Sequence, residues 1–202
     1  MRTGAQGTPG TDGRRPAGPP AAAASGSTGG IGRSTTATAD AVSDQLRRGT
    51  DGYLRQRRRV AALALGSTGA LGVVSLYQTG LLKHVPEPPL RLFDADKVDA
   101  SGEAYSILSM PDAILGMLSS VATAALATMG TKDRVTDRSW LPLLLAAKAA
   151  MDAASGVVLT LEQATKHRRF CSWCLTAAAA SVATFPAALP EARAAWAALR
   201  KR

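Results

Sequence analysis

Long apolar runs separated by short polar segments dominate the chain after its first third. Four of these runs lie at residues 60–82, 111–129, 140–161 and 171–189. A helix rises 1.5 Å per residue, so about 20 apolar residues cross the roughly 30 Å hydrocarbon core of a bilayer. The pattern therefore predicts an all-α fold, in which residues 60–190 form an integral membrane bundle of four helices.

The polar segments divide the rest of the chain. Residues 1–45 are rich in Gly, Pro, Ala, Ser and Thr and have no hydrophobic period, so we expect a disordered arm. Residues 46–59 form a basic juxtamembrane segment, and residues 191–202 form a basic, amphipathic tail. The acidic connection at residues 83–110 is predicted to contain a short helix at 103–108, with Ser101 as its N-cap.

The net charge of +9 comes mainly from the N-terminal arm. Such a charge can indicate nucleic-acid binding. Here the basic cluster adjoins an apolar run, so it is more typical of a cytoplasmic anchor, and we expect no nucleic-acid partner. No signal-peptide pattern precedes the first run.

Loop charges predict the topology. Both termini belong in the cytoplasm, and residues 83–110 and 162–170 belong outside, although the second of these segments contains Lys166, Arg168 and Arg169. We therefore expect a multi-pass protein of the plasma membrane, in contact with lipid.

The two cysteines, Cys171 and Cys174, stand at the head of the fourth run. Residues i and i+3 of a helix share a face about 5–6 Å apart, so these thiols can close and reopen a disulfide. The helix N-terminus and the preceding basic residues favour a thiolate at Cys171. We expect Cys171 to be exposed and Cys174 to lie about 4.5 Å deeper in the membrane.

Two other interpretations of the cysteines stay open. They can be inert small residues of the core. They can also supply half of a zinc site, which only His84 and His167 could complete.

Two opposite charges, Lys148 and Asp152, interrupt the third apolar run one helical turn apart. Charges at membrane depth are costly, and they usually pair or serve a function. One hypothesis is an ion pair that faces the bundle interior. The other is a pair that handles protons or contacts substrate.

The layout resembles the vitamin K epoxide reductase family. The resemblance rests on Ser-Leu-Tyr-Gln-Thr-Gly at residues 75–80, Pro-Asp-Ala-Ile-Leu-Gly at residues 111–116, Lys166 and His167 after the third run, and the Cys-x-x-Cys of Cys171 and Cys174. It covers about two thirds of the chain. Of these features, only the Cys-x-x-Cys at the head of the fourth helix is chemically specific.

The resemblance implies a four-helix membrane oxidoreductase that couples a quinone, as substrate or electron acceptor, to thiol–disulfide exchange without a metal. Cys174 matches the family's cysteine that meets the quinone, and Cys171 matches its disulfide-exchanging partner. Asp99 and Ser101 fall where the family has a serine or aspartate before the half-helix of the loop. With Lys148 and Asp152 they are the predicted substrate-binding residues.

One feature departs from the family. Residues 83–110 contain no cysteine, so the usual loop pair is missing, and no fused thioredoxin-like stretch is visible. We therefore expect a separate thioredoxin-like or other thiol protein, outside the membrane, to reach Cys171 directly. The alternative functions are a non-catalytic membrane interaction or assembly protein with a structural disulfide, and a carrier that uses Lys148 and Asp152.

Overall fold

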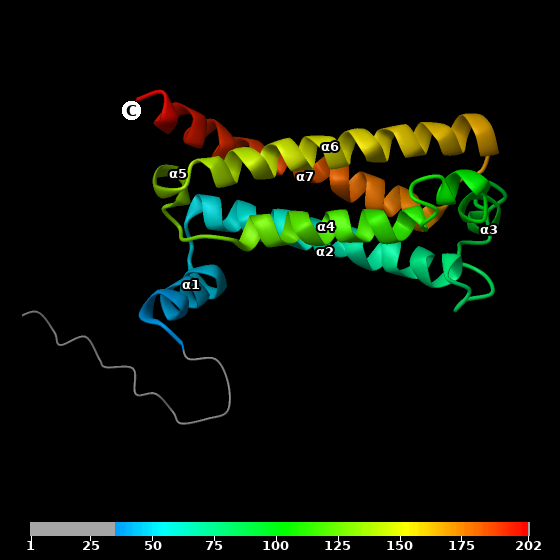
Figure 1. Cartoon of the computed structure of the whole chain (residues 1–202), viewed down its shortest axis with the longest axis horizontal. Coiled ribbons are helices and arrows are strands. Elements are labelled where there is room, and N and C mark those ends of the chain that lie inside the picture. Colours follow the sequence, from blue (N-terminus) through cyan, green and yellow to red (C-terminus); the bar gives the residue numbers. More distant parts are fainter. Residues whose placement is uncertain (1–34, 202) are drawn as a thin grey trace, which may run out of the picture.

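Four long helices lie side by side in the computed structural model, which describes residues 35–201 (Figure 1). They are α2 (Gly52–Gln78), α4 (Asp112–Thr128), α6 (Trp140–Glu162) and α7 (Ser172–Leu199). Helix α2 packs against α4 and α7, and α6 packs against α7. The predicted all-α membrane bundle is confirmed. Most of the predicted disordered arm, residues 1–34, lies outside the described residues.

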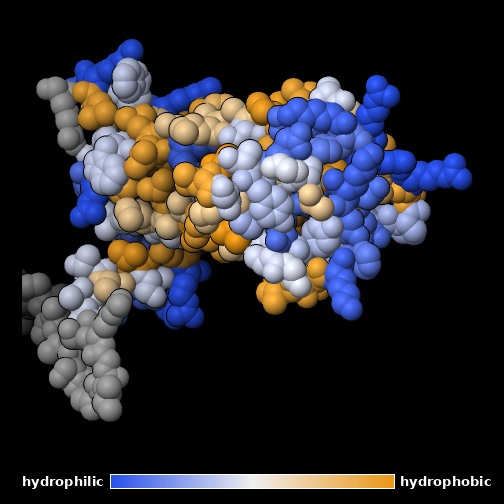
Figure 2. Space-filling model, turned by 45° about the vertical axis from the view of Figure 1, so that its right-hand side comes forward, coloured by the Kyte–Doolittle hydropathy of each residue, from blue (hydrophilic) through white to orange (hydrophobic). Residues whose placement is uncertain are grey.

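The helices have the length and surface that a bilayer requires. Three of them are long and apolar enough to cross a membrane: α2, α7, and α6 together with its extension to His167. Helix α4 has 17 residues, at the short end of the range for a membrane span. Figure 2 shows hydrophobic residues along the sides of the bundle and a largely hydrophilic end, as expected of a protein in contact with lipid.

Two long helices extend beyond the predicted spans, and a further helix precedes the first span. Helix α2 begins at Gly52 rather than residue 60, and α7 continues past residue 189 to Leu199, through Pro186 and Pro190. Helix α1 (Ala37–Arg48) occupies part of the segment predicted to be disordered. The predictions ended each element where charges begin, but several of these charges are neutralised inside the fold.

A buried ionic cluster of Arg57, Arg134 and Glu191 explains why α2 and α7 extend beyond the apolar runs. The exposed fractions of these residues are only 1%, 0% and 3%. Both arginine Nε atoms donate to Glu191 Oε1 at 2.9 Å, and Arg134 Nη2 donates to Oε2 at 2.7 Å. The cluster therefore joins α2, α7 and the short helix α5 (Arg134–Asp137) at one end, which we call the arginine end.

Backbone carbonyl oxygens accept further hydrogen bonds from Arg134, the second arginine of this cluster. Arg134 Nη1 donates to the carbonyl oxygens of Leu126 and Met129 at 2.8 and 2.7 Å, at the C-terminus of α4. A cation is favourable there because the last carbonyls of a helix carry partial negative charge. Arg58 likewise places a cation at the C-terminus of α1, where it donates to the carbonyl oxygens of Leu46 and Gly49.

Small residues let the helices approach closely. A Cβ atom added to Gly156 of α6 would lie 3.2 Å from Cα of Ala178 of α7, so these two helices approach closely at this glycine. The buried core of the arginine half consists mostly of alanines with a few larger residues: Val60, Ala127, Leu145, Ala146, Ala149, Ala188 and Ala192. Such packing is typical of membrane helices.

The long connection, residues 79–111, folds over the opposite end of the bundle, which we call the cysteine end (Figure 1). It contains α3 (Ala95–Asp99) and the 3-10 turn η1 (Gly102–Tyr105). The predicted helix at 103–108 was wrong, because Leu108 and Ser109 both have positive φ and turn the chain toward α4. Ser101 stands at the N-cap of η1, but its side chain makes no capping hydrogen bond.

Candidate functional site

The two cysteines face each other at the start of α7. Cys171 is the N-cap residue, and its Sγ accepts a hydrogen bond from the backbone N–H of Cys174 at 3.1 Å. Both thiols are free. The two sulfur atoms lie within 4.8 Å of each other, as expected of a Cys-x-x-Cys at a helix N-terminus.

The long connection covers Cys171 completely. The Glu87 carboxylate accepts from the backbone N–H of Ser172 at 2.7 Å and from that of Ala95 at 2.6 Å. The Trp173 indole donates to the carbonyl of Pro86 at 2.7 Å. A short parallel bridge between Phe93 and Phe170 adds backbone bonds.

This cover contradicts the prediction that Cys171 is the exposed thiol. Its exposed fraction is 0%, whereas Cys174 is partly exposed. The prediction used only the depth of each residue along the helix. The contacts of Glu87 and Trp173 place the long connection between Cys171 and solvent, so a protein partner can reach this sulfur only after the connection moves.

Asp99 is the acidic residue of the long connection that reaches the thiols. It is 4% exposed, and Cys174 Sγ donates to its Oδ1 at 3.4 Å. Burial away from water raises the pKa of Asp99 to about 6, and hydrogen bonds from Cys171 and Cys174 only partly offset this effect. Asp99 therefore changes its charge within the physiological pH range, next to a thiol.

A half-open cavity of about 330 Å³ begins at this point. Of the predicted site residues, Cys174, Asp99, Ser101 and Asp152 line it. Its walls come from all four long helices and from the long connection, and apolar side chains such as Leu71, Ile107, Leu115 and Leu159 alternate with small and hydroxyl residues. Cys171 lies outside the lining, so Cys174 is the thiol that a molecule in the cavity would meet.

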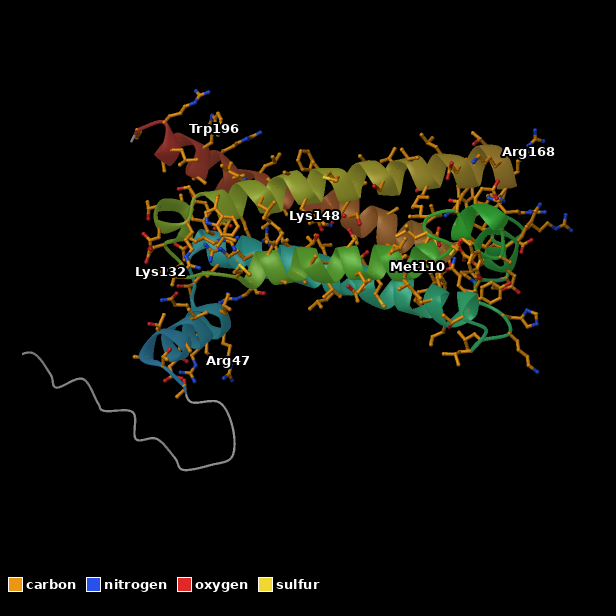
Figure 3. The ribbon with its side chains drawn as sticks, viewed as in Figure 1. Arg47, Met110, Lys132, Lys148, Arg168 and Trp196 are labelled. Carbon is orange, nitrogen blue, oxygen red and sulfur yellow. The ribbon has the colours of Figure 1, made fainter. Side chains whose placement is uncertain are left out.

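Lys148 and Asp152 form an ion pair deep in the bundle. Lys148 Nζ lies 2.6 and 2.7 Å from the two carboxylate oxygens of Asp152. Ser119 and Thr123 of α4 each donate to the same carboxylate at 2.7 Å. Figure 3 shows Lys148 between α6 and α4, near the middle of the bundle. Lys148 does not line the cavity. Its Nζ donates to Ser119 Oγ of α4 at 2.6 Å.

Removing one charge of this pair should destabilise the protein more than removing both. We expect Lys148→Met or Asp152→Asn alone to cost about 2–4 kcal/mol, because each leaves a largely buried charge unpaired. The double variant Lys148→Met/Asp152→Asn should recover most of this loss. Thermal unfolding in detergent measures the three free energies. A double variant that is as stable as wild type but cannot turn over substrate would contradict a purely structural pair.

The predicted alternative of a zinc site completed by histidines does not assemble. His84 is exposed, and its Nδ1 lies 2.6 Å from Asp96 Oδ2. His167 lines the cavity. Among the described residues, it is the carboxylate of Asp99 that joins the two cysteines in a group with metal-ligand spacing.

Sequence reasoning missed three residues that hold the site together. Gln78 donates to Asp112 Oδ1 at 2.7 Å and to the carbonyl of Asp99 at 3.3 Å. Gln163 accepts from the backbone N–H of Cys171 at 3.1 Å, and Glu87 clamps the start of α7. The sequence could have indicated Gln78, because it belongs to the 75–80 stretch on which the family resemblance rests. No local sequence pattern distinguishes Gln163 and Glu87 from other polar residues.

These features define a class of protein: a helical membrane protein with a Cys-x-x-Cys thiol in the wall of a cavity between the helices. A comparison with protein families matches residues 58–189 to the Vitamin K epoxide reductase family, and the chain belongs to this family of membrane oxidoreductases. No curated protein and no solved structure matches the chain.

Proposed function

We propose that this protein couples thiol–disulfide exchange at Cys171 and Cys174 to the reduction of a quinone. The observation that carries the proposal is the position of Cys174, whose partly exposed side chain lines a largely apolar cavity among the helices. A quinone dissolves in lipid and presents a flat apolar ring with two carbonyl oxygens. A cavity of about 330 Å³ falls within the size range of small-molecule sites.

The proposed reaction balances electrons and protons. A thiolate of a client dithiol attacks the Cys171–Cys174 disulfide and forms a mixed disulfide, which the second client thiol resolves. The reduced pair then transfers two electrons and two protons to the quinone, which becomes a quinol, and the disulfide forms again. The net change is client dithiol plus quinone to client disulfide plus quinol.

Asp99 is suited to accept the proton of Cys174. Its Oδ1 lies 3.4 Å from Cys174 Sγ, and both groups line the cavity. A thiolate is the reactive form of cysteine, so a carboxylate that takes the proton activates the sulfur. The same carboxyl group, once protonated, can donate to a quinone oxygen.

A single-turnover experiment tests the coupling. The full chain is purified in detergent, reduced, freed of reductant without oxygen, and mixed with a short-chain quinone analogue. We expect one quinol per protein, followed by its absorbance, together with the loss of two titratable thiols. Quinol formation without thiol loss, or no quinol at all, would contradict the proposal.

The rate of that turnover should depend on the charge of Asp99. Below pH 6 the carboxyl is mostly protonated and cannot accept from Cys174, so the rate should rise with pH around a midpoint near 6. One pH unit below the midpoint only about a tenth of the carboxyl groups are ionised, so the rate should be about tenfold below its high-pH plateau. In Asp99→Asn the rise should disappear. The matched control Asp96→Asn, on the same short helix, should keep the rise of the rate with pH. A wild-type rate that does not change between pH 5 and 7 would refute the role of Asp99 as proton acceptor.

We further propose that the protein lies in the plasma membrane with both termini cytoplasmic and the cysteine end outside, where a thioredoxin-like or other thiol protein would meet it. The basic segment before α2 supports this orientation. Cys171 would then lie on the oxidising side of the membrane, where disulfides persist.

Labelling of intact cells should establish this orientation. In a background with both native cysteines changed to serine, we expect a membrane-impermeant thiol reagent to label Leu90→Cys but not Asp133→Cys, since the first lies at the cysteine end and the second near the arginine end. Both positions are exposed, so burial cannot produce the difference. Permeabilised cells should label both variants, and the opposite pattern in intact cells would invert the topology.

The alternative is an interaction or assembly protein that keeps the fold and a structural disulfide. The complete burial of Cys171 favours it, because structural cysteines are buried whereas exchanging cysteines are usually accessible. Quinone turnover that does not depend on either cysteine would support this alternative.

A further inference from the structure

Three groups with the chemistry of metal ligands meet at the cysteine end. They are the thiols of Cys171 and Cys174 and the carboxyl group of Asp99, and one ligand atom from each lies within 4.8 Å of the other two. Asp99 belongs to α3 and the cysteines to the start of α7, so the fold brings the group together across the long connection.

The second observation is an unsatisfied oxygen. Asp99 is 4% exposed, and within the described part of the chain its Oδ2 has no hydrogen-bond partner. A buried polar atom without a partner costs about 1–3 kcal/mol, and more when the group is charged. A cation between this carboxylate and the thiols would remove that cost.

We propose that the reduced protein binds one thiophilic divalent cation, such as Zn²⁺ or Cd²⁺, through Cys171, Cys174 and Asp99. Zinc is bound by thiolates at about 2.3 Å and by carboxylates at about 2.0–2.2 Å in tetrahedral sites, which places two thiolate sulfurs about 3.8 Å apart. Starting from separations below 4.8 Å, the ligands need to move by about 1 Å at most. Asp99 and Cys174 also line the cavity, so the proposed site adjoins it.

The site would exist only in the reduced state. Binding displaces a proton from each thiol that is protonated, and the disulfide has no thiolate to offer. A bound cation therefore holds the pair reduced and keeps its electrons from an acceptor. Binding itself is independent of quinone chemistry, and only this inhibition rests on the proposed function.

Cadmium titration of the reduced, detergent-purified full chain tests the site. We expect a thiolate-to-cadmium charge-transfer band in the ultraviolet that saturates at one Cd²⁺ per chain and is reversed by competing Zn²⁺. Protein oxidised to the disulfide should show no band. A reduced protein without the band, or an oxidised protein with it, would overturn the proposal.

Asp99→Asn separates the proposed site from simple chelation by two thiols. This variant should weaken Cd²⁺ binding at least about tenfold. Loss of a residue that only hydrogen-bonds to a metal ligand already lowers metal affinity by about 10–100-fold. Asp99→Glu keeps a carboxylate, so it should restore most of the Cd²⁺ affinity. It also controls for a folding defect as the cause of the lost affinity in Asp99→Asn. The control Asp96→Asn should bind as wild type does, because His84 and the backbone N–H of Val85 already engage that carboxylate.

The outcomes separate the two proposals. If Asp99→Asn binds as tightly as wild type, or if Asp99→Glu does not recover, the carboxylate is no ligand and the cation site is refuted. Quinone turnover that survives this result would leave the proposed function intact. Tight Cd²⁺ binding by a protein without quinone turnover would refute the function and keep the site.

Discussion

Quinone turnover should fall by roughly a thousandfold or more in both Cys171→Ser and Cys174→Ser, because each variant lacks half of the dithiol that carries the two electrons. The two variants should differ toward a thiol client. Cys174→Ser leaves Cys171 without a resolving partner, so it should accumulate a mixed disulfide, visible on non-reducing gels. Cys171→Ser should trap no client and still allow Cys174 to contact a quinone.

Ser172→Ala is the matched control, since it lies between the two cysteines and contributes its backbone N–H, which alanine keeps, to Glu87. Its turnover should equal that of wild type. If both cysteine variants turn over quinone at the wild-type rate, the pair is structural. Because the long connection covers Cys171, we expect client trapping to be slow relative to quinone reduction.

Glu191→Gln should cost about 3–5 kcal/mol of stability, because it removes the charge that two buried guanidinium groups share. The substitution keeps the shape of the side chain, so the loss is electrostatic rather than a cavity effect. Thermal unfolding in detergent measures it, and the arginine end of the bundle should lose protection first in hydrogen exchange.

Glu162→Gln provides the comparison for this prediction. Glu162 pairs with Lys166 at 3.0 Å, but both side chains are more than one third exposed, so its removal should cost less than about 1 kcal/mol. Equal losses in the two variants would show that the buried cluster does not stabilise the junction of α2, α5 and α7.

Much of the fold follows from local pattern. An apolar run long enough to cross a bilayer folds as a helix, because the helix satisfies every backbone polar group with hydrogen bonds inside the segment. The cores of α2, α4, α6 and α7 therefore agree with the predicted spans. The ends do not, since Arg57 and Glu191, which read as solvent-exposed charges, neutralise each other from positions 134 residues apart.

The sequence by itself determined the helical membrane bundle, the family resemblance and the proximity of Cys171 and Cys174, because each depends on patterns within short stretches of the chain. Only the tertiary structure decided which acidic residue of the long connection reaches the thiols, which thiol faces the cavity and which one is covered. Those features depend on contacts such as Glu87 with Ser172, between residues 85 positions apart. Distant contacts of this kind leave no periodic signal, since either partner would suit an exposed loop equally well.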